Sequence, residues 1–237
     1  MTATGELNDW SVTAVNLAQH ANNPIHTDAG AQAAGFPRAL VAGVSSYALM
    51  THVPTAAWGD AWLHGGGAHV RFGAPVFDGD TIDLVVVDDD AIELRVDGDR
   101  RAGCELMREG PTMATRDGER LETRTFTPRV EWSVYGERLG DPNGRYTERQ
   151  LIHPAAWVAF ANDVFHTQLV NGSWIHTRSL IAHHDAVTLG NAITIETTVV
   201  DRFPSRAGKR AIADVRITSD GRPIASIEHE AVIELAA

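Results

Sequence analysis

The sequence predicts an α+β protein made of two similar units, each a helix followed by a run of antiparallel strands. Three observations lead to this fold class: a helix-like stretch precedes strand-like stretches twice, turn signals separate the strands, and short stretches recur between the halves. AWLH at residues 61–64 is similar to SWIH at 173–176, and GDTI at 79–82 is similar to GNAI at 190–193. The spacings are 112 and 111 residues, so one single-residue gap aligns the halves as a tandem duplication.

In the first unit the helices are expected before the strands. Thr13 is a candidate N-cap for a short helix that runs through Ala18 and is ended by Pro24. Residues 28–34 predict a second short helix, and residues 38–52 predict a long one. The side chains of the long helix are apolar or small around most of its circumference, which is typical of a helix buried in the centre of a domain. Alternating or β-branched stretches predict strands at residues 69–72, 81–87, 91–96 and 102–107.

The middle of the chain predicts a linker, and the unit then repeats. Residues 109–145 lack periodicity and contain several Gly and Pro turn pairs, with strands expected at most at residues 123–126 and 130–134. A helix is expected from residue 154 to 165, with Pro154 in its first turn. Strands are then expected at residues 174–183, 192–200, 210–218 and 224–235. The predicted domains are a first unit at residues 1–125, a linker at 126–145 and a second unit at 146–237.

Composition narrows the possible partners and the compartment. The chain has 237 residues, of which 43% are hydrophobic and 22% charged, so it can bury a sizeable core. Its single cysteine, Cys104, excludes an internal disulfide and is expected in the core. The net charge of −11 argues against nucleic acid and anionic membranes as partners. The first nine residues do not read as a signal peptide, and no apolar stretch is long enough to span a bilayer, so a cytoplasmic protein is expected.

Four stretches of the first half carry a family resemblance. They are NPIHTD at residues 23–28, AAGF at 33–36, LVAG at 40–43 and RFGAPVFDGD at 71–80. In this order they resemble the MaoC-like hydratase/dehydratase family, over residues 12–107. The resemblance implies a hotdog fold, in which a curved antiparallel sheet wraps a long helix. The second half resembles a degenerate hotdog, so the whole chain is expected to be a double hotdog.

The resemblance also implies an activity and a set of site residues. The family adds water across the double bond of a trans-2-enoyl thioester of coenzyme A or acyl carrier protein, or catalyses the reverse. Carried onto this chain, His26 is the catalytic histidine, Asn23 the motif asparagine, and Gly43 the amide that stabilises the thioester oxyanion at a helix N-terminus. The family's catalytic aspartate is replaced by Ala21. Two nearby residues are the candidates to take its place: Asp28 and His20.

Further residues define expectations for the binding site. The acyl chain is expected in an apolar tunnel beside the long helix, with Trp58 and Trp62 at its mouth or between the halves. A basic patch is expected to bind the phosphates of a CoA carrier. The predicted substrate-binding residues are Val44, Tyr47, Leu49, Met50, Arg206, Lys209 and Arg210. No cofactor is expected, since CoA or acyl carrier protein enters only as the carrier of the substrate. No metal site is expected from His183 and His184, because adjacent residues of a strand point to opposite faces.

Two other functions remain open at this point. Asn162, Asp163 and His166 form a second candidate site, because an acid and a histidine three residues apart share one helical face. This cluster and the loss of the aspartate at Ala21 favour a thioesterase on the same scaffold, since a fold does not determine a reaction. Ala21 also suits a catalytically decayed, acyl-thioester-binding partner subunit. A homodimer is an expectation that no pattern in the sequence tests.

Overall fold

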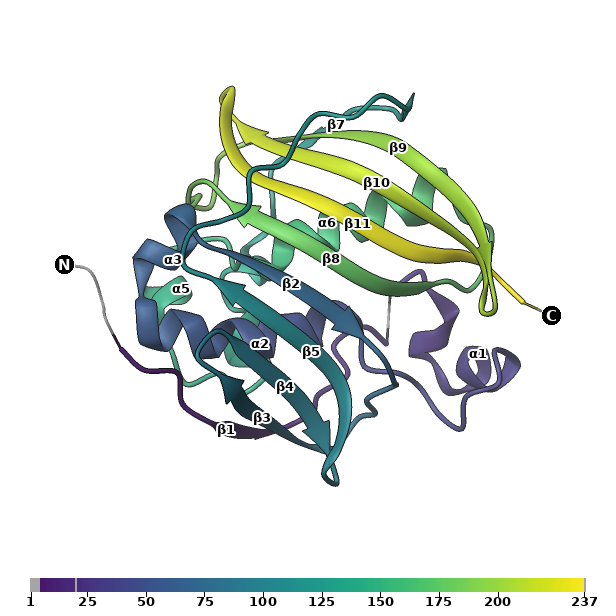
Figure 1. Ribbon diagram of the computed structural model, residues 1–237, viewed down its shortest axis with the longest axis horizontal. Coiled ribbons are helices and arrows are strands. Elements are labelled where there is room, and N and C mark those ends of the chain that lie inside the picture. The colour runs from purple at the N-terminus through teal and green to yellow at the C-terminus, as the bar shows by residue number, and fades with distance from the viewer. Residues whose placement is uncertain (1–4, 20, 237) are drawn as a thin grey trace.

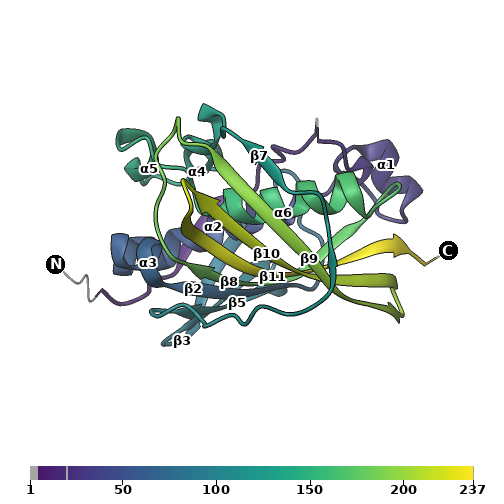
Figure 2. The same ribbon diagram turned by 90° about the horizontal axis from the view of Figure 1, so that it is seen from above.

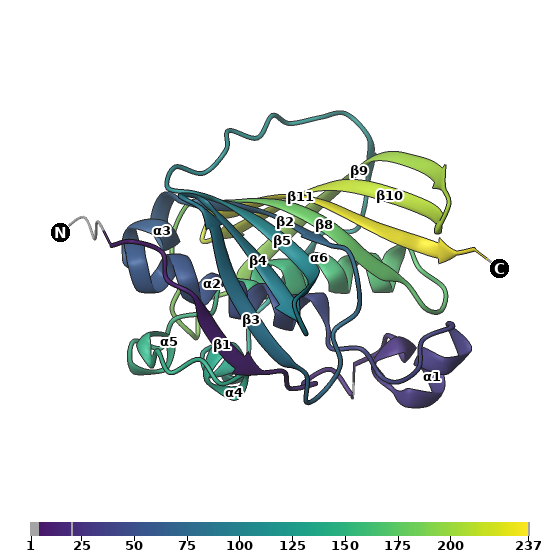
Figure 3. The ribbon, with the colours of Figure 1, turned by 60° about the horizontal axis from the view of Figure 1, so that its bottom comes forward.

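The framework of the protein is one curved antiparallel sheet of eleven strands, seen in a computed structural model that describes residues 5–19 and 21–236. Two long helices lie side by side beneath the sheet, on its concave face (Figures 1 and 3). Shorter helices lie around them at the edges of the molecule (Figure 3). Within the described residues, the helices are all too short or too polar to cross a membrane.

The elements follow each other in the expected order of helix and strands. The strands are β1 (Trp10–Thr13), β2 (Gly67–Phe72), β3 (Thr81–Asp88), β4 (Ala91–Val96), β5 (Asp99–Met107), β6 (Glu119–Arg120), β7 (Arg124–Phe126), β8 (Ile175–His183), β9 (Ile193–Ser205), β10 (Gly208–Ser219) and β11 (Arg222–Leu235). The helices are α1 (Asp28–Ala33), α2 (Gly43–Trp58), α3 (Asp60–Gly65), α4 (Tyr135–Arg138), α5 (Arg145–Glu148) and α6 (Ala155–Gln168), with 3-10 turns η1 (Pro24–His26) and η2 (Val130–Trp132). The strand order across the sheet is β1-β3-β4-β5-β2-β8-β11-β10-β9-β6, and β7 also pairs with β9.

Two copies of one unit build this sheet. In the first, α2 is followed by β2 to β5, and in the second α6 is followed by β8 to β11. Antiparallel pairing of β2 with β8 joins the two half-sheets. The repeat extends to single hydrogen bonds: a bridge joins Leu40 to Phe77, and 111 residues later another joins Leu151 to Thr188. The predicted α+β class and tandem hotdog arrangement are thus confirmed.

Helices α2 and α6 form the centre of the core because they are apolar around most of their circumference. Tyr47, Leu49 and Met50 of α2 are almost fully buried, as is Trp157 of α6. The start of α2 and the second half of α6 lie at the end of the molecule that α1 occupies (Figure 2). Only these two segments of the central helices are therefore placed to form a site at that end.

Several predicted element boundaries are wrong for local reasons. The helix expected from Thr13 through Ala18 does not form: Thr13 ends β1, which pairs with β3, and residues 14–19 are loop and turn. The long helix begins at Gly43 rather than residue 38, because the amides of Leu40 and Val41 bond to the carbonyls of Ile25 and Val76. The strand expected at 130–134 is the 3-10 turn η2.

The segment after β5 crosses to the second unit over the outer face of the sheet (Figure 1). Arg116 anchors the crossing by ion pairs with Asp214 of β10 and Glu228 of β11. Strands β6 and β7 then extend the second half-sheet at β9. Judged by strand pairing, the chain leaves the first unit before residue 119, whereas the sequence predicts that this unit continues to residue 125.

Candidate functional site

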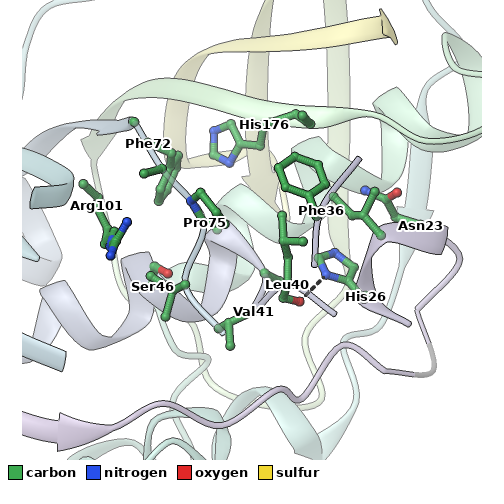
Figure 4. A pocket seen from close by; sticks show the side chains of 18 of the residues that line it. Asn23, His26, Phe36, Leu40, Val41, Ser46, Phe72, Pro75, Arg101 and His176 are labelled. Carbon is green, nitrogen blue, oxygen red and sulfur yellow. Dashed lines mark hydrogen bonds between the residues drawn. The ribbon is translucent and has the colours of Figure 1, made fainter. Parts of the chain in front are cut away.

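Two connected cavities lie where the start of α2 meets the second half of α6. The inner cavity has a volume of about 190 Å³ and the outer groove about 730 Å³. The inner cavity is mainly apolar, with Phe36, Leu40 and Phe72 in its wall (Figure 4). Both cavities are lined by the same five residues, which mark the point where they meet: Asn23, His26, Ala42, Asn162 and Trp174.

His26 is held in one orientation at this junction. It ends the turn η1, is 9% exposed, and its Nδ1 lies 2.8 Å from the carbonyl oxygen of Leu40 (Figure 4). Since a carbonyl can only accept, the Nδ1 proton donates to it and Nε2 keeps a lone pair. Burial lowers the pKa of His26 below its usual 6.5, although the Leu40 carbonyl opposes this. The imidazole is therefore neutral at pH 7 and suited to act as a base.

Short-range contacts explain why the loop around His26 folds as it does. Thr27 caps α1 by accepting a hydrogen bond from the amide of Gly30, and its hydroxyl donates to the carbonyl of Pro24. Asn23 donates through Nδ2 to the carbonyl of Trp174, at 2.9 Å, and so ties the loop to the second unit. Asn23 lines both cavities, but its amide nitrogen serves as a brace.

Two residues considered as replacements for the missing aspartate have different outcomes. Asp28 is exposed, lines neither cavity, and accepts a hydrogen bond from the amide of Ala39, so its carboxylate braces the loop and does not contact the site. His20 lies outside the described residues. Ala21 is exposed at the rim of the outer groove.

Gly43 is the first residue of α2 and lines the inner cavity. The first amides of a helix have no partner within it, and the helix dipole makes this end positive. A methyl group on Gly43 would lie 3.4 Å from the ring of Phe72 and 3.5 Å from Nδ1 of His176. Gly43 therefore lies against the rings of Phe72 and His176, and its role as an oxyanion donor stays a prediction.

The second candidate cluster, Asn162, Asp163 and His166, lines the same two cavities as His26. Asn162 lines both cavities, and Asp163 and His166 line the outer groove, because α6 runs along it. Asp163 and His166 do not form an acid–histidine pair, however. The Asp163 carboxylate lies 3.4 Å from a guanidinium nitrogen of Arg124, and His166 Nδ1 is buried without a hydrogen bond among the described residues.

The structure corrects most of the predicted substrate-binding residues. Only Val44 lines a cavity, the outer groove; Tyr47, Leu49 and Met50 pack into the core because α2 is covered on all sides after its first turn. Trp58 and Trp62 are buried at the opposite end of α2. The predicted basic patch lies on the hairpin of β9 and β10 and lines neither cavity: Arg206 is exposed, Lys209 lines a separate surface groove, and Arg210 pairs with Glu230.

Other residues of the site were missed by the sequence analysis. The predicted linker supplies much of the outer groove, including Arg124, Arg129, Trp132 and Tyr135, and its lack of periodicity gave no sign of this role. His176 lines the inner cavity. The one signal for it was its place in the repeated stretch at residues 173–176.

Buried polar atoms without partners gather around the two cavities. Such atoms are costly unless a ligand or water satisfies them, so a cluster of them indicates a binding site. Six belong to cavity-lining residues and make no hydrogen bond within the described part of the chain: Asn23 Oδ1, Arg101 Nε, Asn162 Oδ1, His166 Nδ1, Trp174 Nε1 and His176 Nδ1. His183 and His184, the adjacent histidines considered as metal ligands, bond to different partners, Tyr47 and Ser226. Among the described residues there is no cluster of three side chains that could hold a metal ion.

Gly30 gives a direct test of how the loop holds His26. A methyl group there would lie 2.1 Å from the Pro24 carbonyl oxygen, so Gly30→Ala must push α1 away from η1. We expect a loss of about 1–3 kcal/mol in the free energy of unfolding, measured by urea titration, together with displacement of the His26 ring. Gly65→Ala is the matched control, since a methyl group there meets open space. Equal stability of the two variants would contradict this account of the loop.

Comparison with known proteins agrees with the fold. Residues 11–104 match the family described as MaoC like domain. A Chloroflexus aurantiacus protein described as a MaoC domain protein dehydratase has a TM-score of 0.65 at 11% identity, with 100% of this chain and 99% of that one covered. A conserved hypothetical protein of Mycobacterium tuberculosis, described as a double hotdog fold, has a TM-score of 0.64 at 13% identity, with 97% and 96% covered.

The fold is also shared with a protein described as a different enzyme. A Lactobacillus plantarum protein described as an oleoyl thioesterase has a TM-score of 0.56 at 11% identity, with 99% of both chains covered. No curated protein sequence matches the chain. At these identities the solved structures establish the fold alone, whereas the match over residues 11–104 identifies the first unit. The first unit is therefore similar to the MaoC-like domain family, and the whole chain has the double hotdog fold.

Proposed function

We propose that this protein adds water across the double bond of a short trans-2-enoyl thioester, or removes it in the reverse reaction, with His26 as the general base. One observation carries the proposal: the His26 ring, oriented by the Leu40 carbonyl, lines the same cavity as Gly43, whose amide opens α2. A base and an oxyanion donor within one apolar cavity are the groups that conjugate addition to a thioester needs.

In hydration, His26 transfers one proton from water to the substrate, and Gly43 stabilises the negative charge that forms in between. Nε2 of His26 takes a proton from water while the water oxygen attacks C3 of the enoyl group. The electron pair of the double bond moves toward the thioester oxygen, where the Gly43 amide and the positive end of α2 stabilise the resulting enolate. His26 then returns the proton to C2, which leaves a 3-hydroxyacyl thioester and the neutral imidazole. No cofactor is needed for this sequence.

Two asparagines compensate in part for Ala21 in this proposal. The family resemblance places an aspartate there to help hold the water, and alanine cannot. Asn23 Oδ1 and Asn162 Oδ1 are buried, lack partners within the described residues, and belong to residues that line both cavities next to His26. An amide oxygen can accept a hydrogen bond from water and orient it, although it cannot take the proton.

The two cavities suit the two parts of an acyl thioester. The inner cavity is the more enclosed and apolar of the two, and its volume of about 190 Å³ is the smaller. The larger outer groove carries Arg124 and Arg129, which suit the phosphate groups of coenzyme A or the acidic surface of an acyl carrier protein. We therefore propose a short acyl chain in the inner cavity and the carrier arm in the groove.

The test is to incubate the protein with crotonyl-CoA and trans-2-hexenoyl-CoA and follow both the enone absorbance and the mass of the products. Hydration predicts loss of absorbance and a product heavier by one water, with no free thiol. Release of free thiol without hydration would instead identify a thioesterase, for which the same base could direct water to C1. Binding without either product would indicate a partner subunit, and Ala21→Asp would then be expected to restore hydration.

A further inference from the structure

A buried chain of three side chains lies behind the wall of the inner cavity. Nε2 of His176 is 2.9 Å from Oγ of Ser179, and Oγ of Ser179 is 2.9 Å from Nδ1 of His229. His176 and Ser179 belong to β8, and His229 lies opposite Ser179 on β11. The two imidazole rings stack at 4.3 Å between their centres. No step of the hydration chemistry described above uses this chain.

The free end of the chain lies beside the expected oxyanion position. His176 is 7% exposed, lines the inner cavity, and its Nδ1 has no hydrogen bond among the described residues. The same atom would be 3.5 Å from a methyl group on Gly43, so it lies close to the residue that begins α2. Figure 4 shows the ring at the wall of the cavity, near Phe72.

Both histidines are neutral because they are buried. Burial lowers the pKa of His176 to about 3, although the backbone of Arg178 and the carboxylate of Glu230 oppose this. Burial also takes the pKa of His229 well below its usual value, and the neighbouring His176 ring lowers it further. A neutral imidazole has one donor and one acceptor nitrogen, so the hydroxyl of Ser179 can join the rings in only two ways. In one, His176 Nδ1 carries a proton; in the other, it carries a lone pair.

The cost of buried groups favours the first arrangement. There, Ser179 donates to His176 Nε2 and accepts from His229 Nδ1, so the free proton lies on His176 Nδ1, at the cavity, where a ligand can accept it. The remaining lone pair is on His229 Nε2, which is buried against Phe165 without a partner. The second arrangement would bury an unpaired N–H there instead, and unpaired buried donors are rarer than unpaired acceptors.

We propose that His176 Nδ1–H is a second donor to the thioester oxygen, beside the amide of Gly43, and that Ser179 and His229 are positioning residues that fix its proton. This inference rests on the proposed function, because it assigns a catalytic role within the same site. Two donors from different units, one a backbone amide and one a side chain, then hold the developing enolate oxygen. Loss of one such donor lowers kcat by roughly 10²-fold to 10³-fold with a smaller effect on KM.

The experiment measures polarisation of the bound carbonyl without requiring turnover. Butyryl-CoA labelled with ¹³C at the thioester carbon is bound to the full-length protein, and its carbonyl stretching frequency is recorded by infrared difference spectroscopy. The wild type is expected to lower this frequency relative to water. His176→Phe, which keeps the ring shape but has no donor, is expected to lose part of this shift, and Ser179→Ala to lose it in part as well.

Two further variants distinguish loss of the hydrogen-bond donor from a general structural effect of the substitution. His176→Asn retains an N–H donor in a similar place and is expected to recover part of the shift, which a purely structural role would not produce. His184→Asn removes another serine-bonded histidine that lines neither cavity, and is expected to leave the shift unchanged.

The outcomes separate this inference from the proposed function. An unchanged shift in His176→Phe would overturn the role of His176 while leaving His26 and Gly43 as the hydration site. Failure of the wild type to bind any acyl-CoA would overturn both. A lowered frequency whose shift is partly lost in His176→Phe supports the inference even if the wild type hydrates no enoyl-CoA tested.

Discussion

Replacing His26 with alanine is expected to lower kcat/KM for hydration of a short enoyl-CoA by roughly 10²-fold to 10⁴-fold, the usual contribution of a general base. The physical reason is that His26 is the titratable group at the junction of the cavities whose proton is fixed on Nδ1 by a carbonyl, which leaves Nε2 to accept a proton from water. The measurement is the rate of loss of enone absorbance at substrate concentrations well below KM.

His26→Asn tests separately the two roles of His26, as a general base through Nε2 and as a hydrogen-bond donor to Leu40 through Nδ1. Asparagine can still donate through its amide to the Leu40 carbonyl, so the loop is retained, but it offers no basic nitrogen. It should therefore be as inactive as the alanine variant while remaining more stable. The wild-type rate should also fall with decreasing pH, with an inflection below pH 6.5, because burial lowers the pKa of His26. Activity of His26→Asn within tenfold of wild type would exclude a basic role.

The free energy of unfolding is expected to drop steeply as the pH falls from 6.5 to about 4. Burial lowers the pKa of His153 to about 4 and those of His176 and His183 to about 3. The folded protein leaves these rings uncharged in this range, whereas the unfolded chain protonates them near pH 6.5 and is thereby favoured. Linkage gives a loss of about 2 kcal/mol for each ring at pH 5, against a typical total of roughly 5–15 kcal/mol.

Urea titrations at pH 7.5 and pH 5 measure this loss, and one pair of variants assigns it. His183→Gln removes a ring packed against Trp62 and should flatten the pH dependence by about 2 kcal/mol, whatever its effect on stability at pH 7.5. His153→Gln removes a second buried ring and should flatten the pH dependence by a similar amount. If both variants kept the wild-type pH dependence, the buried histidines would not be its source.

Most of the fold could be predicted because it depends on short-range patterns. Period-two stretches such as residues 91–96 and turn glycines such as Gly79 and Gly190, both of positive φ, locate the strands and the repeat. The start of α2 could not be located this way. Residues 38–42 have helical composition, but long-range bonds from Leu40 to Ile25 and from Val41 to Val76 keep them extended.

The site could be predicted only for the residues that belong to recognisable short motifs of the first unit. His26, Asn23 and Gly43 stand in a recognisable motif and do line one cavity. Asn162 was seen as part of an alternative site, because the sequence alone does not reveal that α6 packs against the start of α2. The groove arginines Arg124 and Arg129 stand in an aperiodic segment, whose course around the sheet edge is set by tertiary contacts alone.

The junction of β2 with β8 makes the two units a fused, unequal pair, and this has a consequence for stoichiometry. In the second unit, the residue 111 places after His26 is Glu137, which is exposed on α4, so the histidine is not repeated there. A symmetric pair of identical subunits would repeat each substitution in two sites. In a fused chain the two units can change independently, so α6 of the second unit can form a wall for the substrate of the first unit. Each polypeptide would then accommodate a single acyl group at this junction.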